Sequence, residues 1–255
     1  IHFAEEDRMR HLYVIGQTGT GKSGALELLT LSDIYYDQGF AVIDPHGDYA
    51  QHVLNFIPER RLDDVVYFNP ADTDYPIGFN PLEISDPSLK GHISSELVGV
   101  LKRLFAESWG PRLEYILRNT LLALSEVPGM TLVEIPRLLT DREFRHATIA
   151  KVNDPVIKRY FENEFDKMPE KMLQESISPI LNKVGQFISS PLIRAIIERP
   201  QSSIDIEEIM NDGKILIANL SQGKMGEDNA ALIGAMLITK FPLRDASGEP
   251  DKVCT

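Results

Sequence analysis

A short glycine-rich stretch constrains the fold of this chain more than any other feature of its sequence. The residues from Gly16 to Ser23 read Gly-Gln-Thr-Gly-Thr-Gly-Lys-Ser and fit the pattern G-x-x-x-x-G-K-[ST]. The apolar run 12–15 before it predicts a buried strand, and the apolar residues after it predict a helix to about Asp37, with Gly39 placed to end that helix. The sequence therefore predicts a strand, a loop and a helix in direct succession.

This pattern is the P-loop, and its residue types follow from what a nucleotide's phosphates need. Several backbone N–H groups must converge on the anion, and glycines allow backbone conformations that a Cβ would penalise. The start of the following helix adds further N–H groups and the positive end of its dipole. We expect Lys22 to reach the β- and γ-phosphates and the Ser23 hydroxyl to bind Mg²⁺. The predicted nucleotide-binding residues are Gly16, Gln17, Thr18, Gly19, Thr20, Gly21, Lys22 and Ser23.

The alternative is an ordinary glycine-rich turn, which is disfavoured because the fixed positions and both flanks occur together.

Strands are also predicted at three later places. The run 40–44 completes a βαβ unit, whose strands should be parallel with a right-handed crossover. Further strands are predicted at 65–68 and 214–220, with a helix at about 229–241. We expect an α/β fold in which one mostly parallel sheet holds its ligand at the carboxyl ends of its strands.

Asp44 ends the second predicted strand, immediately before a Pro-His-Gly turn. At the carboxyl edge of the sheet its carboxylate could hold a water on Mg²⁺ or orient the attacking water. The alternative is a strand-terminal acid that starts the turn. For His46 and Asp48, which follow, we favour the reading of a solvated turn.

The long middle part of the chain, from about Leu89 to Met210, has helical periodicity. Its apolar residues recur at i, i+3, i+4 and i+7, as on a half-buried helix. Breaks that contain Pro or Gly separate the helical stretches at 109–111, 128–129, 154–155 and 190–191. Asp205 with Glu208 resembles a capping box before a last short helix. We predict an all-helical insertion in the α/β fold.

Composition narrows the classes of protein to which the chain can belong. It has 255 residues, 43% of them hydrophobic, and a formal net charge of −12, which argues against binding nucleic acid through bulk charge but leaves room for a local basic strip. The single cysteine, Cys254, fits a reducing compartment, and no spacing suggests a zinc site. No apolar run is long enough to span a bilayer, and the acidic start does not resemble a signal peptide. We expect a cytoplasmic location.

Three stretches together resemble the HerA/FtsK superfamily of P-loop motors. They are 16–23, the run Ala-Val-Ile-Asp-Pro-His-Gly-Asp-Tyr at 41–49, and Gly-Phe-Asn-Pro-Leu at 78–82. Within that superfamily the chain looks most like the TraG/TraD-type coupling ATPases of conjugation and type IV secretion. The resemblance implies a RecA-like ATPase with ATP and Mg²⁺ as cofactors. It also implies a homo-oligomeric ring, a hexamer, that moves DNA or protein–DNA cargo.

The resemblance also assigns roles and parts. It favours a catalytic role for Lys22 and Asp44 and a metal-binding role for Ser23 and Asp44. It implies that regions outside this chain reach a membrane secretion apparatus, at the inner face of the bacterial membrane. The predicted parts are the N-terminal part of the ATPase core, the helical insertion, and the returning strand and helix of the core, at 1–88, 89–210 and 211–255.

One feature of the family is missing from the sequence. The family places an acidic pair, the Walker B Asp-Glu, on a strand after the helix that ends near Phe241, and the chain reaches Thr255 without one. Asn219, at the end of the strand 214–220, cannot replace it. We therefore expect this chain to bind nucleotide and hydrolyse it poorly, and the full-length protein to be an ATPase. The alternatives are a nucleotide-binding fragment and a non-motor P-loop enzyme such as a small-molecule kinase.

Several residues are weaker candidates. Arg112 or Arg118 could serve a neighbouring subunit as the arginine that stabilises the transferring phosphoryl group, but a helix-surface arginine is favoured. Trp109 and Tyr115 could stack on bases, although packing is favoured. Gln222 follows a strand tip and could sense the γ-phosphate.

Overall fold

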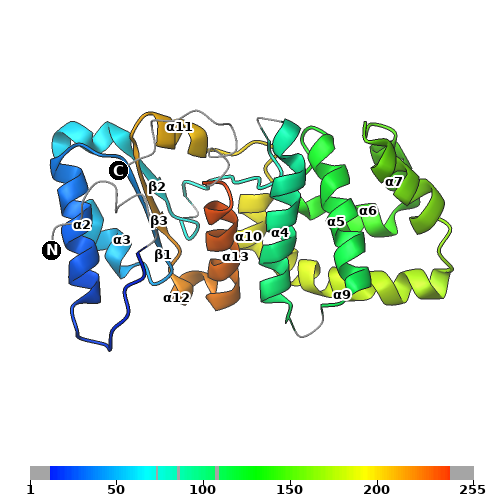
Figure 1. Ribbon diagram of the computed structural model, residues 1–255, viewed down its shortest axis with the longest axis horizontal. Coiled ribbons are helices and arrows are strands. Elements are labelled where there is room, and N and C mark those ends of the chain that lie inside the picture. The colour runs from blue at the N-terminus through cyan, green and yellow to red at the C-terminus, as the bar shows by residue number, and fades with distance from the viewer. Residues whose placement is uncertain (1–11, 73, 85–86, 107–108, 242–255) are drawn as a thin grey trace.

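The computed structural model describes residues 12–72, 74–84, 87–106 and 109–241, which form an elongated molecule with a small sheet toward one end (Figure 1). The sheet has three parallel strands in the order β1-β3-β2. Their bounds are Phe40–Asp44 for β1, Val65–Phe68 for β2 and Ile215–Asn219 for β3. Three of the predicted strands thus pair in one parallel sheet, and the predicted α/β fold class is confirmed.

Five helices lie at the end of the molecule that holds the sheet (Figure 1). They are α2 (Lys22–Tyr35), α3 (Asp48–Leu54), α11 (Ile206–Asn211), α12 (Gln222–Met225) and α13 (Glu227–Ile238). All five residues of the central strand β3 are buried, and the side chains of the first four alternate between two hydrophobic clusters. Ile215 and Ile217 pack in the cluster that contains α3, whereas Leu216 and Ala218 belong to the cluster that contains α13. Both faces of the sheet are therefore covered.

The rest of the molecule is helical. Its elements are α4 (Lys90–Leu104), α5 (Pro111–Glu126), α6 (Ile135–Thr140), α7 (Arg142–Ile149), α8 (Pro155–Arg159), α9 (Glu170–Ser189) and α10 (Pro191–Ile197), with a π-helix at Tyr160–Phe165 and 3₁₀ turns at Glu59–Asp64, Pro87–Leu89 and Leu132–Glu134. Helix α13 packs on α4, α4 on α5, and α5 on α9. One hydrophobic cluster therefore continues from a face of the sheet through the whole helical part.

The helices begin where the sequence predicts breaks. Pro111, Pro155 and Pro191 lie in the first turns of α5, α8 and α10, where a missing N–H costs no helical bond. The Asp205 carboxylate accepts the N–H of Glu208 at 3.1 Å and caps α11. Helical structure in the middle of the chain is confirmed, since no strand occurs between β2 and β3 in the described residues.

Asn80 joins distant parts of the chain. Its side chain is buried, and its amide donates to the carbonyl oxygens of Met130 at 3.0 Å and Pro200 at 2.9 Å. Its Oδ1 accepts the N–H of Leu82 at 3.0 Å, while its own N–H donates to the Ser202 hydroxyl at 3.0 Å. The connection that leaves β2 is thereby fixed to the loop that follows α5, within the helical part, and to the loop that follows α10.

Arg61 holds the amino ends of all three strands. Its buried guanidinium donates to the carboxylate of Asp64, which precedes β2, at 2.8 Å. It also donates to the carbonyl oxygens of Gln38, before β1, and Gly213, before β3, at 3.0 and 2.8 Å. A buried guanidinium with three partners is well compensated, and its role is structural.

Gly39 does not end the preceding helix, contrary to the sequence prediction. Helix α2 stops at Tyr35, and Asp37 takes the left-handed conformation with φ 56°. A Cβ on Gly39 would lie 2.7 Å from the main chain of Gly213. Glycine is required here by the close approach of two strand entrances.

The strand predicted at 12–15 is also wrong. These residues have no strand structure, and Tyr13 and Ile15 are 86% and 79% exposed. A run of four residues needs a neighbouring strand to bond its backbone, and none of the described strands pairs with it. Helix α2, predicted to pack on the sheet, buries only Thr30, Asp33 and Ile34.

Within the described residues no helix is both long enough and apolar enough to cross a membrane. Cys254 and the end of the third predicted part, 242–255, lie outside the described residues.

Candidate nucleotide-binding site

The loop before α2 has the backbone that a phosphate cradle needs. Gly19 and Gly21 have φ of +84° and +90°, in the left-handed region that favours glycine. A Cβ on Gly16 would lie 2.5 Å from the Oγ1 of Thr20, which donates to the carbonyl oxygen of Gln17 at 2.8 Å. Each glycine of the pattern thus lies where the closed loop either has a left-handed backbone or leaves no room for a Cβ.

Lys22 folds back over this loop. Its ammonium donates to the carbonyl oxygens of Gly16 at 2.7 Å and Gln17 at 2.8 Å. These bonds hold the positive charge beside the loop instead of leaving it free in solvent. An anion that enters the loop therefore meets a positioned cation, which lowers the entropic cost of recognition.

The N-terminus of α2 is open. Gly21 is its N-cap, no side chain caps the first turn, and the first turn carries no acidic residue. The first N–H groups of a helix have no partner within the helix, and together with the dipole they favour an anion. Ser23 lies exposed in this first turn, so its hydroxyl is accessible to a bound ion. The loop 16–21, Lys22 and the start of α2 together form the candidate phosphate-binding site, called the P-loop unit below.

Asp44 lies at the carboxyl end of β1 and is buried. Its Oδ1 accepts the N–H of His46 at 2.9 Å and its Oδ2 accepts the N–H of Ala50 at 3.0 Å. The carboxylate thus starts the turn after β1 and accepts an N–H of α3, as expected if Asp44 is a strand-terminal acid that begins the turn. Each oxygen keeps a further lone pair, so these bonds do not consume its capacity to bind a water.

The turn after β1 touches the end of β3. Asp44 and Asn219 are register partners, and the buried Asn219 amide donates to the Tyr67 hydroxyl at 2.9 Å. Its Oδ1 accepts the N–H of Ser221 at 3.2 Å. Gly47, with φ +90°, approaches so closely that a Cβ there would lie 2.5 Å from that oxygen. The carboxyl ends of β1 and β3 are thereby locked together.

A hydroxyl pair joins the P-loop helix to the helix that follows β1. The Oγ1 of Thr30 in α2 lies 2.6 Å from the Tyr49 hydroxyl in α3. Burial raises the pKa of Tyr49, so the phenol stays protonated and can donate or accept in this pair. Helix α2 begins at the same edge of the molecule at which β3 runs into α12 (Figure 1). Phosphate-binding loop and strand ends therefore share one edge.

The described residues contain no group of three or more His, Cys, Asp or Glu side chains that could hold a metal ion alone. Mg²⁺ usually keeps waters and binds through one or two protein groups plus the phosphates of its nucleotide. Ser23 and Asp44 are the residues that suit this pattern here. Any such ion would arrive with the nucleotide.

The weaker sequence candidates fall in other places. The Arg118 guanidinium bonds Ser95 at 2.8 Å and Glu114 at 3.4 Å on the helical part, as a helix-surface arginine does. Gln222 starts α12, and its N–H donates to the Pro45 carbonyl at 3.0 Å. His46 is exposed in the turn, as expected of a solvated turn, whereas Asp48 is exposed at the first position of α3.

Sequence reasoning set Asn219 aside because it is not an acid. The structure shows it as the polar hub at the ends of β1, β2 and β3, with Tyr67 as its partner. The sequence signal for its role was that Asn219 is the only polar residue of the strand and ends an otherwise apolar run. A buried amide in that place has to find partners, and these partners fix the loops around it.

A comparison with protein families matches residues 4–240 to a family described as the central domain of the helicase HerA. A comparison with curated proteins gives no significant match. The family match covers most of the chain and includes the P-loop, the turn after β1 and the helical part. The chain belongs to the HerA helicase central-domain family and is a HerA/FtsK-type P-loop ATPase domain.

Proposed function

We propose that this chain is the ATP-binding motor domain of a ring-forming protein that moves DNA. The observation that carries the proposal is the P-loop unit, with Lys22 held over the loop carbonyls beside the open N-terminus of α2. In this proposal the loop and helix N–H groups hold the phosphates of ATP. Lys22 places its charge on the β- and γ-phosphates, and Ser23 and Asp44 hold Mg²⁺ directly or through water.

The finer proposal is a coupling ATPase of the TraG/TraD type, which would pass DNA or protein–DNA complexes to a secretion apparatus in the membrane. The stretches 41–49 and 78–82 support it, because their sequences resemble those proteins. The ring, proposed as a hexamer of identical chains, would place a neighbour's arginine at each nucleotide. We also keep the division into core and insertion at 1–88, 89–210 and 211–255 as a proposal.

The same residues support a second candidate, a domain that binds nucleotide but hydrolyses it slowly by itself. Of the three described strands, only β1 ends on a carboxylate, so the described strands place a single acid, Asp44, at their carboxyl ends. Hydrolysis needs a group that positions the attacking water and charge that neutralises the transferring phosphoryl group. We therefore expect strong nucleotide binding with low turnover by this chain alone.

The test compares Lys22→Ala with Lys151→Ala, an exposed lysine outside the loop. ATP or ADP with Mg²⁺ should raise the melting temperature of the wild type and of Lys151→Ala, because a ligand that binds only the folded state stabilises it. Lys22→Ala should lose most of that shift. Phosphate release measured with and without DNA then separates motor from binding domain. An equal thermal shift in the two variants would contradict the assignment.

A further inference from the structure

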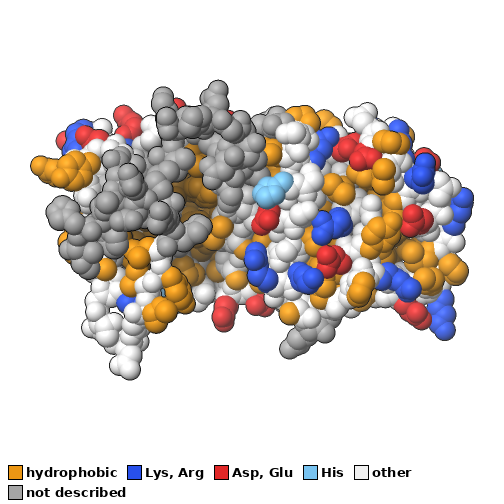
Figure 2. Space-filling model, in the orientation of Figure 1, with side chains coloured by type: hydrophobic (Ala, Val, Ile, Leu, Met, Phe, Trp, Pro, Cys, Tyr) orange, Lys and Arg blue, Asp and Glu red, His pale blue; other side chains and the backbone are white. Residues whose placement is uncertain are grey.

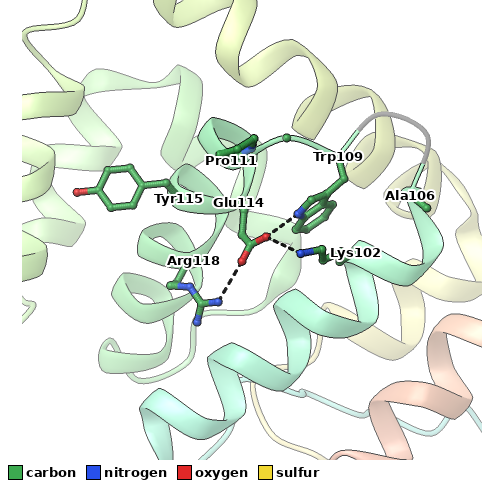
Figure 3. A pocket seen from close by; sticks show the side chains of 8 residues that line it. Lys102, Ala106, Trp109, Pro111, Glu114, Tyr115 and Arg118 are labelled. Atoms are coloured by element: carbon green, nitrogen blue, oxygen red, sulfur yellow. Dashed lines mark hydrogen bonds and ion pairs between the residues drawn. The ribbon is translucent and has the colours of Figure 1, made fainter.

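A hollow of about 620 Å³ lies on the helical part, outside the P-loop unit, where the end of α4 meets the start of α5 (Figure 3). Its lining combines two aromatic side chains, two cations and one carboxylate; these are Trp109, Tyr115, Lys102, Arg118 and Glu114. The phosphate-binding residues do not use this hollow. Its volume falls within the range of small-ligand sites and could accept one nucleotide.

Glu114 organises the hollow. Its Oε2 accepts the indole N–H of Trp109 at 2.8 Å and the Lys102 ammonium at 3.1 Å, and its Oε1 accepts Arg118 at 3.4 Å. The indole hydrogen bond, followed by that of Lys102, holds the pKa of Glu114 below its usual range. The carboxylate is therefore charged at neutral pH. Figure 3 shows the indole and both cations turned toward it, while Tyr115 points away to the other side.

The cations keep donors for a ligand. Lys102 uses one of its three N–H groups on Glu114, and Arg118 uses two of its five on Glu114 and Ser95. Two positive charges and one negative charge leave the lining with a charge of +1, on a chain of net charge −12. Figure 2 shows Lys and Arg side chains over α4 and α5, interspersed with acidic ones. The hollow is thus a local basic spot on an acidic protein.

An aromatic face beside phosphate-binding cations is the combination that binds unpaired nucleotides, because every base has a face that can stack. A duplex hides those faces between its own bases. We propose that the hollow between α4 and α5 binds one nucleotide of single-stranded DNA, with the base against Trp109 and the neighbouring phosphates on Lys102 and Arg118. This inference rests on the proposed DNA-moving function and names a contact of the strand outside the P-loop unit.

Trp109 is the only tryptophan in the chain, so its fluorescence reports on this hollow alone. Titration of the full chain with a short oligothymidylate should quench the tryptophan emission with a saturable curve. The midpoint should coincide with binding measured by the anisotropy of a labelled oligothymidylate. Raising the salt concentration should weaken both signals together, because phosphate contacts release counterions.

Three variants test the residues. Trp109→Ala should weaken binding roughly 10-fold or more, because the base no longer has an aromatic face on which to stack. The double variant Lys102→Ala with Arg118→Ala should bind more weakly and lower the salt slope by about 0.7 for each phosphate that it no longer neutralises. The control is Arg137→Ala, an exposed arginine of α6 paired with Asp141, the residue that follows α6, and it should bind as the wild type does.

The variant Glu114→Gln tests whether the affinity for single-stranded DNA rises or falls when the negative charge in the hollow is removed. The Gln oxygen can still accept the indole N–H, while the charge that repels phosphate is gone, so binding should become tighter. A merely structural Glu114 would give unchanged binding or, if the hollow loosens, weaker binding, and either result would overturn the proposal. This variant also covers the case in which Trp109→Ala fails to fold.

Two failures are distinguishable. If labelled DNA binds and stimulates ATP hydrolysis but tryptophan emission does not change and the double variant binds normally, the strand binds elsewhere. The inference about the hollow then fails while the proposed function stands. If DNA neither binds nor affects hydrolysis, the proposed function fails as well.

Discussion

At the scale of single residues, the carboxyl edge of the sheet is held by side chains that bond backbone groups. Asp44 accepts two N–H groups of the turn and helix that follow it, and the Asn219 oxygen accepts that of Ser221. Each bond uses a short polar side chain at a strand end, where the backbone has left the sheet ladder and needs new partners. The positions of these side chains therefore depend on the exact course of the turn.

Gly47 is the residue on which that course depends most. Gly47→Ala would put a Cβ on a backbone with φ +90° and 2.5 Å from the Asn219 oxygen. The left-handed conformation alone costs on the order of 1–3 kcal/mol for a residue with a side chain, and the clash adds to it. We expect a clear fall in the midpoint of denaturant unfolding and weaker stabilisation by Mg²⁺ and ATP, because Asp44 loses its turn.

Gly24→Ala is the matched control for this prediction. Gly24 lies inside α2 and a Cβ there meets nothing within 4 Å. Alanine is favoured over glycine inside a helix, by roughly 0.5–1 kcal/mol. The control should therefore be neutral or slightly stabilising. Equal stability of Gly47→Ala and Gly24→Ala would show that the turn after β1 adapts and that its geometry does not matter for the site.

At the scale of elements, the connection that leaves β2 joins the sheet to the helices through hydrogen bonds. Besides the four hydrogen bonds of Asn80 described above, the Phe79 N–H donates to the Ile196 carbonyl at 2.9 Å, and the Gly78 N–H to the Ser203 hydroxyl at 2.9 Å. A Cβ on Gly78 would meet the Arg199 side chain at 2.4 Å. The stretch 78–82, which carries part of the family resemblance, therefore owes its residue types to packing and hydrogen bonding.

Asn80→Ala tests how much these hydrogen bonds stabilise the fold. The variant leaves the carbonyls of Met130 and Pro200 and the N–H of Leu82 without their partner, in a place where Asn80 itself is only 2% exposed. Unsatisfied buried groups of this kind should lower the free energy of unfolding by roughly 2–4 kcal/mol in total. Denaturant unfolding followed by circular dichroism measures the loss. A change below about 0.5 kcal/mol, the size of an ordinary surface substitution, would show that water replaces the amide.

Much of this element layout follows from the sequence. Periodic apolar residues and prolines or glycines at the breaks placed the helices, and three short apolar runs placed the strands of the sheet. These signals are local, so they can be read along the chain. The glycines of the P-loop could also be predicted from the motif. Gly19 and Gly21 have left-handed conformations, and Gly16 lies where a Cβ would meet Thr20.

The remaining features depend on tertiary packing that sequence patterns do not contain. The run 12–15 has the composition of a strand, but pairing decides whether a strand forms. The π-helix at Tyr160–Phe165 buries three aromatic rings that touch one another, and its apolar stripe looks the same as that of an α-helix. The role of Asn219 required the positions of β1 and β2, and the hollow beside Trp109 required the packing of α4 on α5.

At the scale of the whole molecule, the larger of the two hydrophobic clusters is continuous from the sheet through the helical part, and helix α2 lies outside it. One cluster runs from Leu216 and Ala218 of β3 through α13 and α4 to Leu121 and Leu124 of α5. Helix α2 stands apart from this core, since only three of its fourteen residues are buried and Leu28 is 70% exposed. The P-loop is therefore attached to the least buried helix beside the sheet.

This distribution predicts two levels of stability in hydrogen exchange. Amides of β3 and of α5 should exchange only through the same global unfolding, because they share one packed core and cannot open without exposing it. Amides of α2 should exchange through smaller, local openings. Exchange measured by mass spectrometry at increasing denaturant should merge the β3 and α5 peptides into one transition. ADP with Mg²⁺ should slow exchange in α2 more than in α5, because the proposed nucleotide site lies at the start of that helix. Exchange of α5 at a lower opening free energy than β3 would instead show the helical part to be an independent folding unit, joined to the sheet by the hydrogen bonds of Asn80 but not by a common core.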